Sequence, residues 1–285
     1  MKLGHILRAA IPLALFAMAA MPAHKDEVLL RRELKPQARD TYRLETMRHQ
    51  VVTLPNSETR DDTISIGMDC TFKTGSKVED ERVPIEIEFS KFKFQPENLI
   101  PNKDLPKKVK LSGWLNEMNE LTELSTSKAK AKEKQLAASA LQMLQRVQQA
   151  WTFPEDPVEP GETWEVSLPL IPGGEEKDIV FQMKFEGEEE MGDKRYWKLS
   201  AKDSVPIRVD LGAQGNDAGS MTVRGDIEIK MQLLFERSGR LFSQLSEMRS
   251  DLTIDYSRAT GKMKVVEDTV SRWTSLNRPK STKGA

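Results

Sequence analysis

The amino-acid sequence predicts a mainly β fold (α+β), with one or more large, curved antiparallel sheets of long strands and one amphipathic covering helix. Apolar and polar residues alternate over most of the chain, which is the period of a strand with one buried face. Short turn signals such as Ser238-Gly239 and Thr260-Gly261 separate successive strands and favour antiparallel pairing. A single segment, residues 127–151, changes to helical spacing.

The composition excludes several classes of function. The 285 residues include 43 basic and 44 acidic residues, for a formal net charge of −1. No basic excess is available to neutralise phosphates, so we expect no nucleic-acid partner. Three His and one Cys leave little material for catalysis or metal binding by these residue types. At about 150 residues per domain, the length indicates one or two domains.

Residues 1–23 have the features of a signal peptide. Lys2 and Arg8 precede an apolar run, Ala9–Ala23, that ends in small residues suited to cleavage after Ala19 or Ala23. The run is shorter than the roughly 20 apolar residues of a comfortable transmembrane helix, although an uncleaved anchor is the alternative. We therefore expect an exported protein, periplasmic or extracellular, with no transmembrane segment after signal removal. The absence of an Asn-x-Ser/Thr sequon makes a bacterial envelope the simplest location.

The remaining chain divides by composition and pattern into five predicted segments. They are an N-terminal linker (24–39), a β-rich half (40–125), a helix with a Pro-rich connector (126–160), a second β-rich half (161–276) and a disordered tail (277–285).

In the first half, alternation from Ile64 to Phe72 predicts a strand and makes Cys70 a core residue rather than a reactive thiol. A second strand begins at Val83. Its apolar phase changes before Phe92, which predicts a β-bulge near Ser90-Lys91.

In the second half, further strands are predicted where apolar residues occupy every second position. The longest run, Met221–Phe235, would span about 50 Å at about 3.3 Å per residue. Strands of this length belong to large curved sheets, and Gly225 within the run is a candidate bend point.

The helical segment carries an apolar stripe at 3.6-residue spacing, formed by Leu136, Ala140, Met143, Leu144, Val147 and Trp151. Four lysines in its first turns oppose the helix dipole, so we expect fraying before Glu133. Pro154, Pro157 and Pro160 then impose an extended connector, interpreted as a strap to the next strand rather than a ligand for a proline-reading domain.

The sequence contains few motifs that indicate catalysis or metal binding. His24 and His49 belong to no zinc motif, and no nucleophile elbow is present, so we predict no catalytic residue, metal site or cofactor. The loop 212–219 could bind calcium but is better interpreted as a hairpin loop. The acidic run Glu186–Glu190 could contact a basic partner, although a solvated turn is commoner. A glycosidase-type pair of carboxylates stays open, because sequence does not show which acids converge.

Methionines recur at core positions of the predicted strands. Their flexible, polarizable side chains suit surfaces that accept varied apolar ligands. Ile64, Met68, Met183 and Met231 are therefore candidate lining residues of a ligand site, and the alternative is that they fill an ordinary core.

The connector also carries a resemblance. Phe153-Pro154, Pro157-Val158, Gly161 and Trp164, between a helix and a strand, resemble an element of an uncharacterised family of exported bacterial β-rich proteins. The Ser238–Leu241 turn is similar to that family too. The resemblance implies a curved antiparallel sheet with helical cover, similar in outline to lipoprotein-carrier and lipid-binding clamshells, and it implies no catalytic residues.

These observations favour a non-enzymatic envelope protein that binds a lipid or other hydrophobic ligand, or a lipidated envelope protein, in a curved sheet. The alternative is a structural or protein-interaction module whose sheet faces are fully packed. An enzyme would require a pocket with converging carboxylates.

Overall fold

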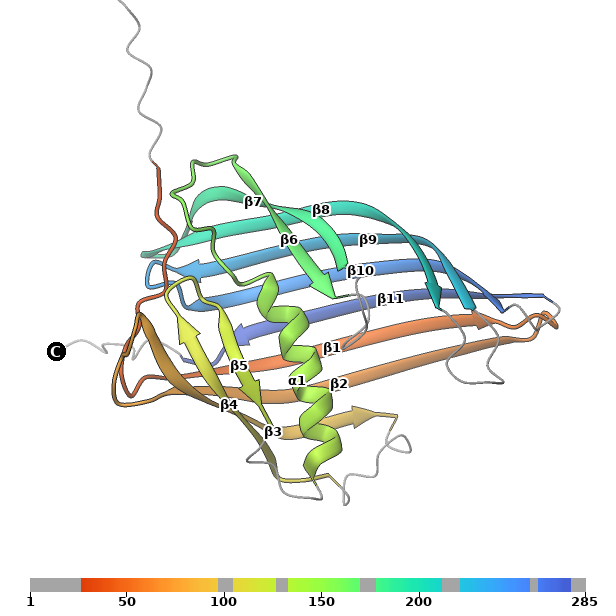
Figure 1. The fold of residues 1–285 in the computed structure, drawn as a ribbon, viewed down its shortest axis with the longest axis horizontal. Helices are drawn as coiled ribbons and strands as arrows, with labels where there is room; N and C mark the ends of the chain where they lie inside the picture. Colours follow the sequence, from red (N-terminus) through yellow and green to blue (C-terminus); the bar gives the residue numbers. More distant parts are fainter. Residues whose placement is uncertain are drawn as a thin grey trace, which may run out of the picture.

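The computed structural model describes residues 27–96, 105–126, 133–169, 178–211, 221–256 and 261–277. Within them, eleven strands form one antiparallel sheet that does not close on itself, in the order β5-β4-β3-β2-β1-β11-β10-β9-β8-β7-β6 (Figure 1). The single helix of this part of the chain is α1, Lys134–Gln149. The predicted fold class, a large antiparallel sheet with one helix, is confirmed.

The strands, in chain order, are β1 (Arg39–Thr53), β2 (Thr59–Thr74), β3 (Arg82–Gln95), β4 (Lys108–Asn116), β5 (Leu121–Ser125), β6 (Thr163–Pro169), β7 (Asp178–Met191), β8 (Lys194–Leu211), β9 (Met221–Glu236), β10 (Leu241–Tyr256) and β11 (Lys262–Ser275). The two β-rich halves of the sequence belong to one sheet, because β1 pairs with β11 along twelve residue pairs.

The long strands follow the predicted alternation. β9 matches the Met221–Phe235 run, and its pairing with β8 and β10 continues through Gly225 without a register shift. Gly225 has φ +152°, and an added Cβ would lie 1.9 Å from the Asp251 carbonyl oxygen on β10. The glycine is therefore required for the close approach of the two backbones.

The predicted bulge is also confirmed. The β2–β3 register shifts between Gly67 and Asp69, opposite Ser90 and Lys93, and Lys91 has φ +55°. The bulge brings Lys91 beside the buried Asp69 carboxylate, which also accepts a hydrogen bond from Arg43. Burial alone would raise the pKa of Asp69, but the hydrogen bonds from Arg43 and Lys91 bring it below the usual value.

One face of the sheet, called here the inner face, carries α1 and the hydrophobic core. Fully buried members of the core come from both ends of the strand order and include Ile87, Phe89, Met183, Phe185, Leu199, Leu233, Phe235 and Trp273. The opposite, outer face carries ion pairs between neighbouring strands, such as that of Lys110 with Glu86 at 2.9 Å. This division between an apolar and a charged face is what the alternation predicts.

Helix α1 connects the two edges of the open sheet, because it packs against β4 and β5 at one edge and β6 at the other (Figure 1). Its buried residues are Ala137, Ala140, Leu144 and Gln148. The Gln148 side chain accepts a hydrogen bond from the Leu121 backbone N–H at 2.9 Å. Just beyond the helix, the Trp151 indole N–H donates to the buried Gln244 side chain at 2.7 Å. The helix thus closes one end of the sheet by packing and by specific polar contacts.

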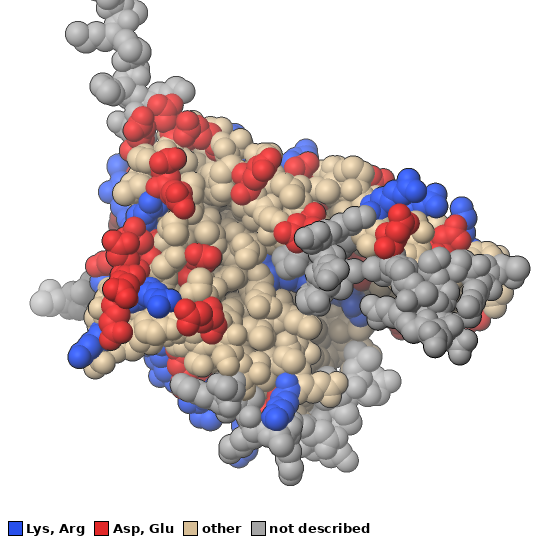
Figure 2. Space-filling view, in the orientation of Figure 1, with Lys and Arg blue, Asp and Glu red and all other residues tan. Residues whose placement is uncertain are grey.

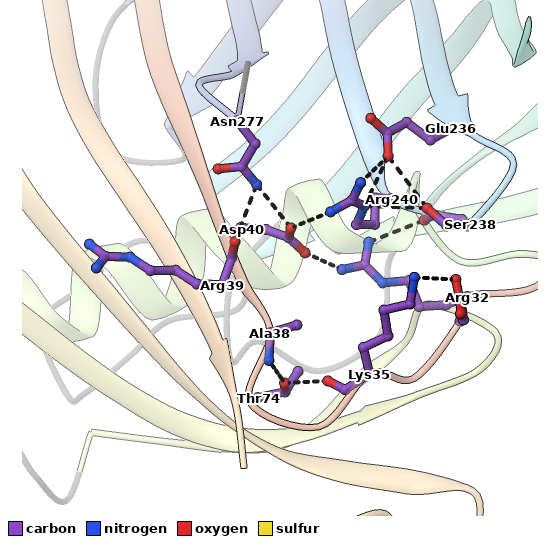
Figure 3. A network of polar contacts seen from close by, with 12 residues as sticks. Arg32, Lys35, Ala38, Arg39, Asp40, Thr74, Glu236, Ser238, Arg240 and Asn277 are labelled. Carbon is purple, nitrogen blue, oxygen red and sulfur yellow. Dashed lines mark hydrogen bonds and ion pairs between the residues drawn. The ribbon is translucent and has the colours of Figure 1, made fainter. Parts of the chain in front are cut away.

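The N-terminal segment and a buried polar network close the same end (Figure 3). Val28 and Val158 exchange backbone hydrogen bonds, and Leu30 is fully buried. Arg32 forms an ion pair and a hydrogen bond with Asp40, and both side chains are less than a tenth exposed. The Asp40 carboxylate also accepts hydrogen bonds from Arg240 at 3.4 Å and Asn277 at 3.0 Å. This network links the N-terminal segment to β1, to the β9–β10 turn and to the end of β11.

Candidate ligand-binding face

The four predicted lining residues all lie on the inner face. Met183 and Met231 belong to one cross-strand row through Ala201, and Met68 lies in a neighbouring row with Leu44. Ile64 is two rows further from α1 than Met68. Met68 and Met183 are buried, whereas Ile64 and Met231 are half-buried. Two of the four residues therefore belong to the packed core, and two reach the surface of the face.

The core beside the C-terminal end of α1 is closely packed. The void at this end has a volume of about 20 Å³, comparable to the room needed by one water molecule. Aromatic rings pack beside this void: Trp151 lies 5.1 Å from Trp273 and 6.2 Å from Phe72, centroid to centroid. The void is lined in part by Arg32 and Asp40 of the buried network. A void of this size has no room for a hydrophobic ligand among these residues.

Beyond the filled core, apolar side chains continue along the inner face and remain half-buried. Those of the sheet include Ile64, Ile66, Phe92, Val205, Val223, Met231, Met248 and Leu252, and those of α1 are Leu136, Leu141, Met143 and Val147. In Figure 2, Asp and Glu gather at the left end of the molecule, while residues other than acids and bases fill the centre of this face. The inner face thus carries apolar side chains that remain partly exposed.

The two central strands interrupt this apolar surface with a block of six polar side chains. The block, called here the polar island, consists of Thr46, Arg48 and Gln50 on β1 and their cross-strand partners Ser271, Thr269 and Glu267 on β11. All six are half-buried. Apolar pairs border the island at both ends, Leu44 with Trp273 and Val52 with Val265.

Hydrogen bonds connect most members of the polar island. The Thr46 and Ser271 hydroxyl groups lie 3.0 Å apart. Glu267 accepts hydrogen bonds from Gln50 at 3.0 Å and Thr269 at 3.2 Å. Arg48 forms an ion pair with the same carboxylate at 4.0 Å and, among the described residues, makes no hydrogen bond. Its guanidinium therefore retains donors on a half-exposed side chain.

Two buried indole N–H groups on the inner face, those of Trp164 and Trp273, have no hydrogen-bond partner among the described residues. Trp164 lies in the same cross-strand row as Met183 and Met231. An unmet buried donor costs about 1–3 kcal/mol. The inner face thus retains capacity for polar as well as apolar contacts.

The side chains with reactive chemistry are placed in structural roles. Cys70 is fully buried, and burial raises its thiol pKa well above the usual value, so it is not poised as a nucleophile. His49 contacts Asp61 at 2.8 Å, and both side chains are exposed. Within the described ranges, no group of three or more His, Cys, Asp or Glu is arranged to hold a metal ion. The loop 212–219, interpreted from the sequence as a hairpin loop with calcium binding as the alternative, lies outside these ranges.

One sequence interpretation is wrong. The acidic run Glu186–Glu190 was expected to form a solvated turn, but it lies within β7, and the turn follows at Gly192-Asp193. Ion pairs with basic side chains of neighbouring segments explain why a strand can accommodate this acidic run. Glu189 pairs with Lys198 at 2.6 Å, and Glu188 pairs with Arg237 at 2.7 Å.

The polar island was not predicted, because its residues break the alternation that marks a strand with one buried face. In β1, the inner positions after Leu44 are Thr46, Arg48 and Gln50, so this strand has no apolar parity to detect. The informative signal is the cross-strand partnership with β11, which depends on pairing between the two ends of the chain.

The class of structure that emerges is an open, eleven-stranded sheet with one helix between its edges and a partly apolar inner face. No protein-family model matches the chain, and no curated protein matches it. Among solved structures, one of lipovitellin, described by its lipid–protein interactions, is similar at 12% identity with a TM-score of 0.47. The match covers 89% of this chain and 27% of lipovitellin, so this chain spans about a quarter of that protein's length. In the described ranges, no helix has the length and apolar character needed to cross a membrane.

Proposed function

We propose that the protein is a non-enzymatic, exported binding protein of the bacterial envelope that holds a lipid or another hydrophobic ligand on its inner face. The signal-like residues 1–23 support export. The observation that carries the binding proposal is the run of half-buried apolar side chains that continues from the core onto the open part of the inner face.

The physical reason is the free energy of covering apolar surface. Removing apolar surface from water contributes about 25 cal/mol per Å². Side chains such as Ile66, Met231 and Met248 retain part of this surface in the described structure, so an apolar ligand that lies against them gains it. Methionine also adapts to ligands of different shape.

A structural or protein-interaction module is the second candidate. The close packing around the void of about 20 Å³ near the C-terminal end of α1 favours it, because a ligand carrier usually encloses more space. In this case the half-buried apolar surface would contact a protein partner in the envelope.

Native mass spectrometry with lipid extraction distinguishes the two candidates. For the mature protein purified from the envelope fraction, we expect a stoichiometric, extractable acyl ligand. Met231→Glu, on the inner face, is expected to abolish retention, whereas Val180→Glu, at an exposed position of β7, serves as the matched control. A ligand-free mass for the wild-type protein, together with no binding of added lipid, would exclude the carrier proposal and favour the interaction module.

A further inference from the structure

We propose that the ligand is an amphiphile with an anionic head group, a carboxylate or a phosphate, which binds at Arg48 in the polar island while its acyl part lies on the neighbouring apolar strands. This inference rests on the proposed function and names the class of ligand that the inner face accepts.

The first argument is the placement of the polar island. Its six side chains lie in the middle of a face that is apolar towards α1 and apolar again at Val52 and Val265. A purely hydrocarbon ligand spanning this face would cover the Arg48 guanidinium, which has no hydrogen-bond acceptor among the described residues, without offering it a hydrogen bond. Each such loss costs about 1–3 kcal/mol, and more for a charged group. The ligand must therefore present a polar group at this point.

The second argument identifies the kind of polar group. Glu267 accepts hydrogen bonds from Gln50 and Thr269, and the Thr46 and Ser271 hydroxyls contact each other. Arg48 is different, because the 4.0 Å ion pair with Glu267 leaves its guanidinium N–H groups without a hydrogen-bond acceptor among the described residues. A guanidinium carries five donors in a planar fork that matches a carboxylate or phosphate. The polar island thus has positively charged hydrogen-bond donors, those of Arg48, that no described acceptor engages.

The third argument places the acyl part. The row through Arg48 and Thr269 continues to the half-buried Ile64 on β2 in one direction and to the half-buried Met248 on β10 in the other. Beyond Met248 lie the buried Ile229 and then Asp203. Neighbouring strands are about 4.8 Å apart, so these apolar side chains begin within one or two strand spacings of the guanidinium. An acyl chain attached to a head group at Arg48 therefore reaches Ile64 one strand away, or Met248 two strands away beyond Thr269.

Three ligands with the same acyl chain test the inference by isothermal titration calorimetry below their micellar concentrations. Oleic acid carries a carboxylate, 1-oleoyl-lysophosphatidic acid carries a phosphate, and 1-oleoylglycerol is neutral. We expect the wild-type mature protein to bind one or both anionic ligands at least about tenfold more tightly than the neutral ligand. Comparison of the two anions distinguishes a free fatty acid from a phospholipid as the source of the head group.

Substitutions at Arg48 should remove this preference. We expect Arg48→Gln to weaken binding of the preferred anion about tenfold while 1-oleoylglycerol binding is unchanged, and Arg48→Lys to have an intermediate effect, because it keeps the charge but loses the fork. Glu267→Gln should strengthen anion binding, since it removes a nearby negative charge. Arg249→Gln is the matched control: Arg249 lies on the outer face of β10, where it pairs with Asp268 at 3.7 Å.

The outcomes separate this inference from the proposed function. If the wild-type protein binds 1-oleoylglycerol as tightly as the anionic ligands, or if Arg48→Gln weakens all three equally, the head-group assignment is overturned although ligand binding stands. If the wild-type protein binds none of the three, the proposed function itself is overturned. Thermal unfolding by circular dichroism confirms that each variant is folded before its affinity is compared.

Discussion

Removal of the Asp40 carboxylate tests whether the buried network of Figure 3 holds the N-terminal segment on the sheet. The Asp40 and Arg32 side chains are 4% and 7% exposed, so water does not screen their interaction. In Asp40→Ala, the Arg32 guanidinium stays buried without its carboxylate. Arg240 is less affected, because it also forms an ion pair with Glu236.

The expected change in the free energy of unfolding follows from leaving one charge of the pair buried without its partner. Removing one partner of a buried ion pair typically costs 3–5 kcal/mol, and we expect Asp40→Ala to lower the free energy of unfolding by about this amount. Arg32→Ala should cost less, since Asp40 then still accepts hydrogen bonds from Arg240 and Asn277. The double variant should cost less than the sum of the single variants by about 2 kcal/mol, because no charge is then left buried alone.

Urea unfolding followed by tryptophan fluorescence measures these free energies without changing the ionic strength. Asp61→Ala is the control, because Asp61 is an exposed acid whose contact with His49 should contribute no more than about 0.5 kcal/mol. A cost below about 1 kcal/mol for Asp40→Ala, or additivity of the two single variants within about 0.5 kcal/mol, would refute the reasoning.

Three further predictions concern stability and reactivity. Gly225→Ala should destabilise the protein strongly, because the added Cβ would overlap a carbonyl oxygen of β10. Gly67→Ala should be nearly neutral, because its added Cβ meets only a Lys93 side-chain carbon at 3.7 Å. Equal midpoints of thermal unfolding for the two variants would contradict this prediction. Asp69 has a lowered pKa when folded, so its stabilising contribution is present above about pH 4 and lost as the pH falls through the folded value. The urea midpoint of Asp69→Asn should therefore approach that of the wild type in acid, and a constant difference from pH 3 to pH 7 would count against the ion pairs. The buried Cys70 thiol should react with a thiol reagent at pH 8 only after unfolding; rapid reaction of the native protein would show that the core opens locally.

Much of the fold could be predicted from local pattern. Alternation identified the long strands that became β2, β3 and β9, and helical spacing identified α1. The phase change before Phe92 located the bulge at Lys91. These features are recorded in the sequence because each depends on the side-chain periodicity of its own segment, or on the next strand along the chain.

The strand β1 was not predicted individually, although it pairs with β11 at the centre of the sheet. Its inner positions Thr46, Arg48 and Gln50 are polar, so alternation gave no signal there. The residues that make the polar island lie more than 200 positions apart, and only the register between the two ends of the chain brings them together. For the same reason, the most specific part of the candidate site was absent from the sequence-based prediction.

The sequence by itself determined which side chains share the inner face, because the two-residue period of a strand assigns each residue to one side. It placed Ile64, Met68, Met183 and Met231 on that face, and the structure agrees. Only the tertiary structure decided that Met68 and Met183 are buried while Ile64 and Met231 reach the surface. Burial depends on which elements pack over each strand, and contacts such as those of α1 with strands from both edges of the sheet are encoded by no local pattern.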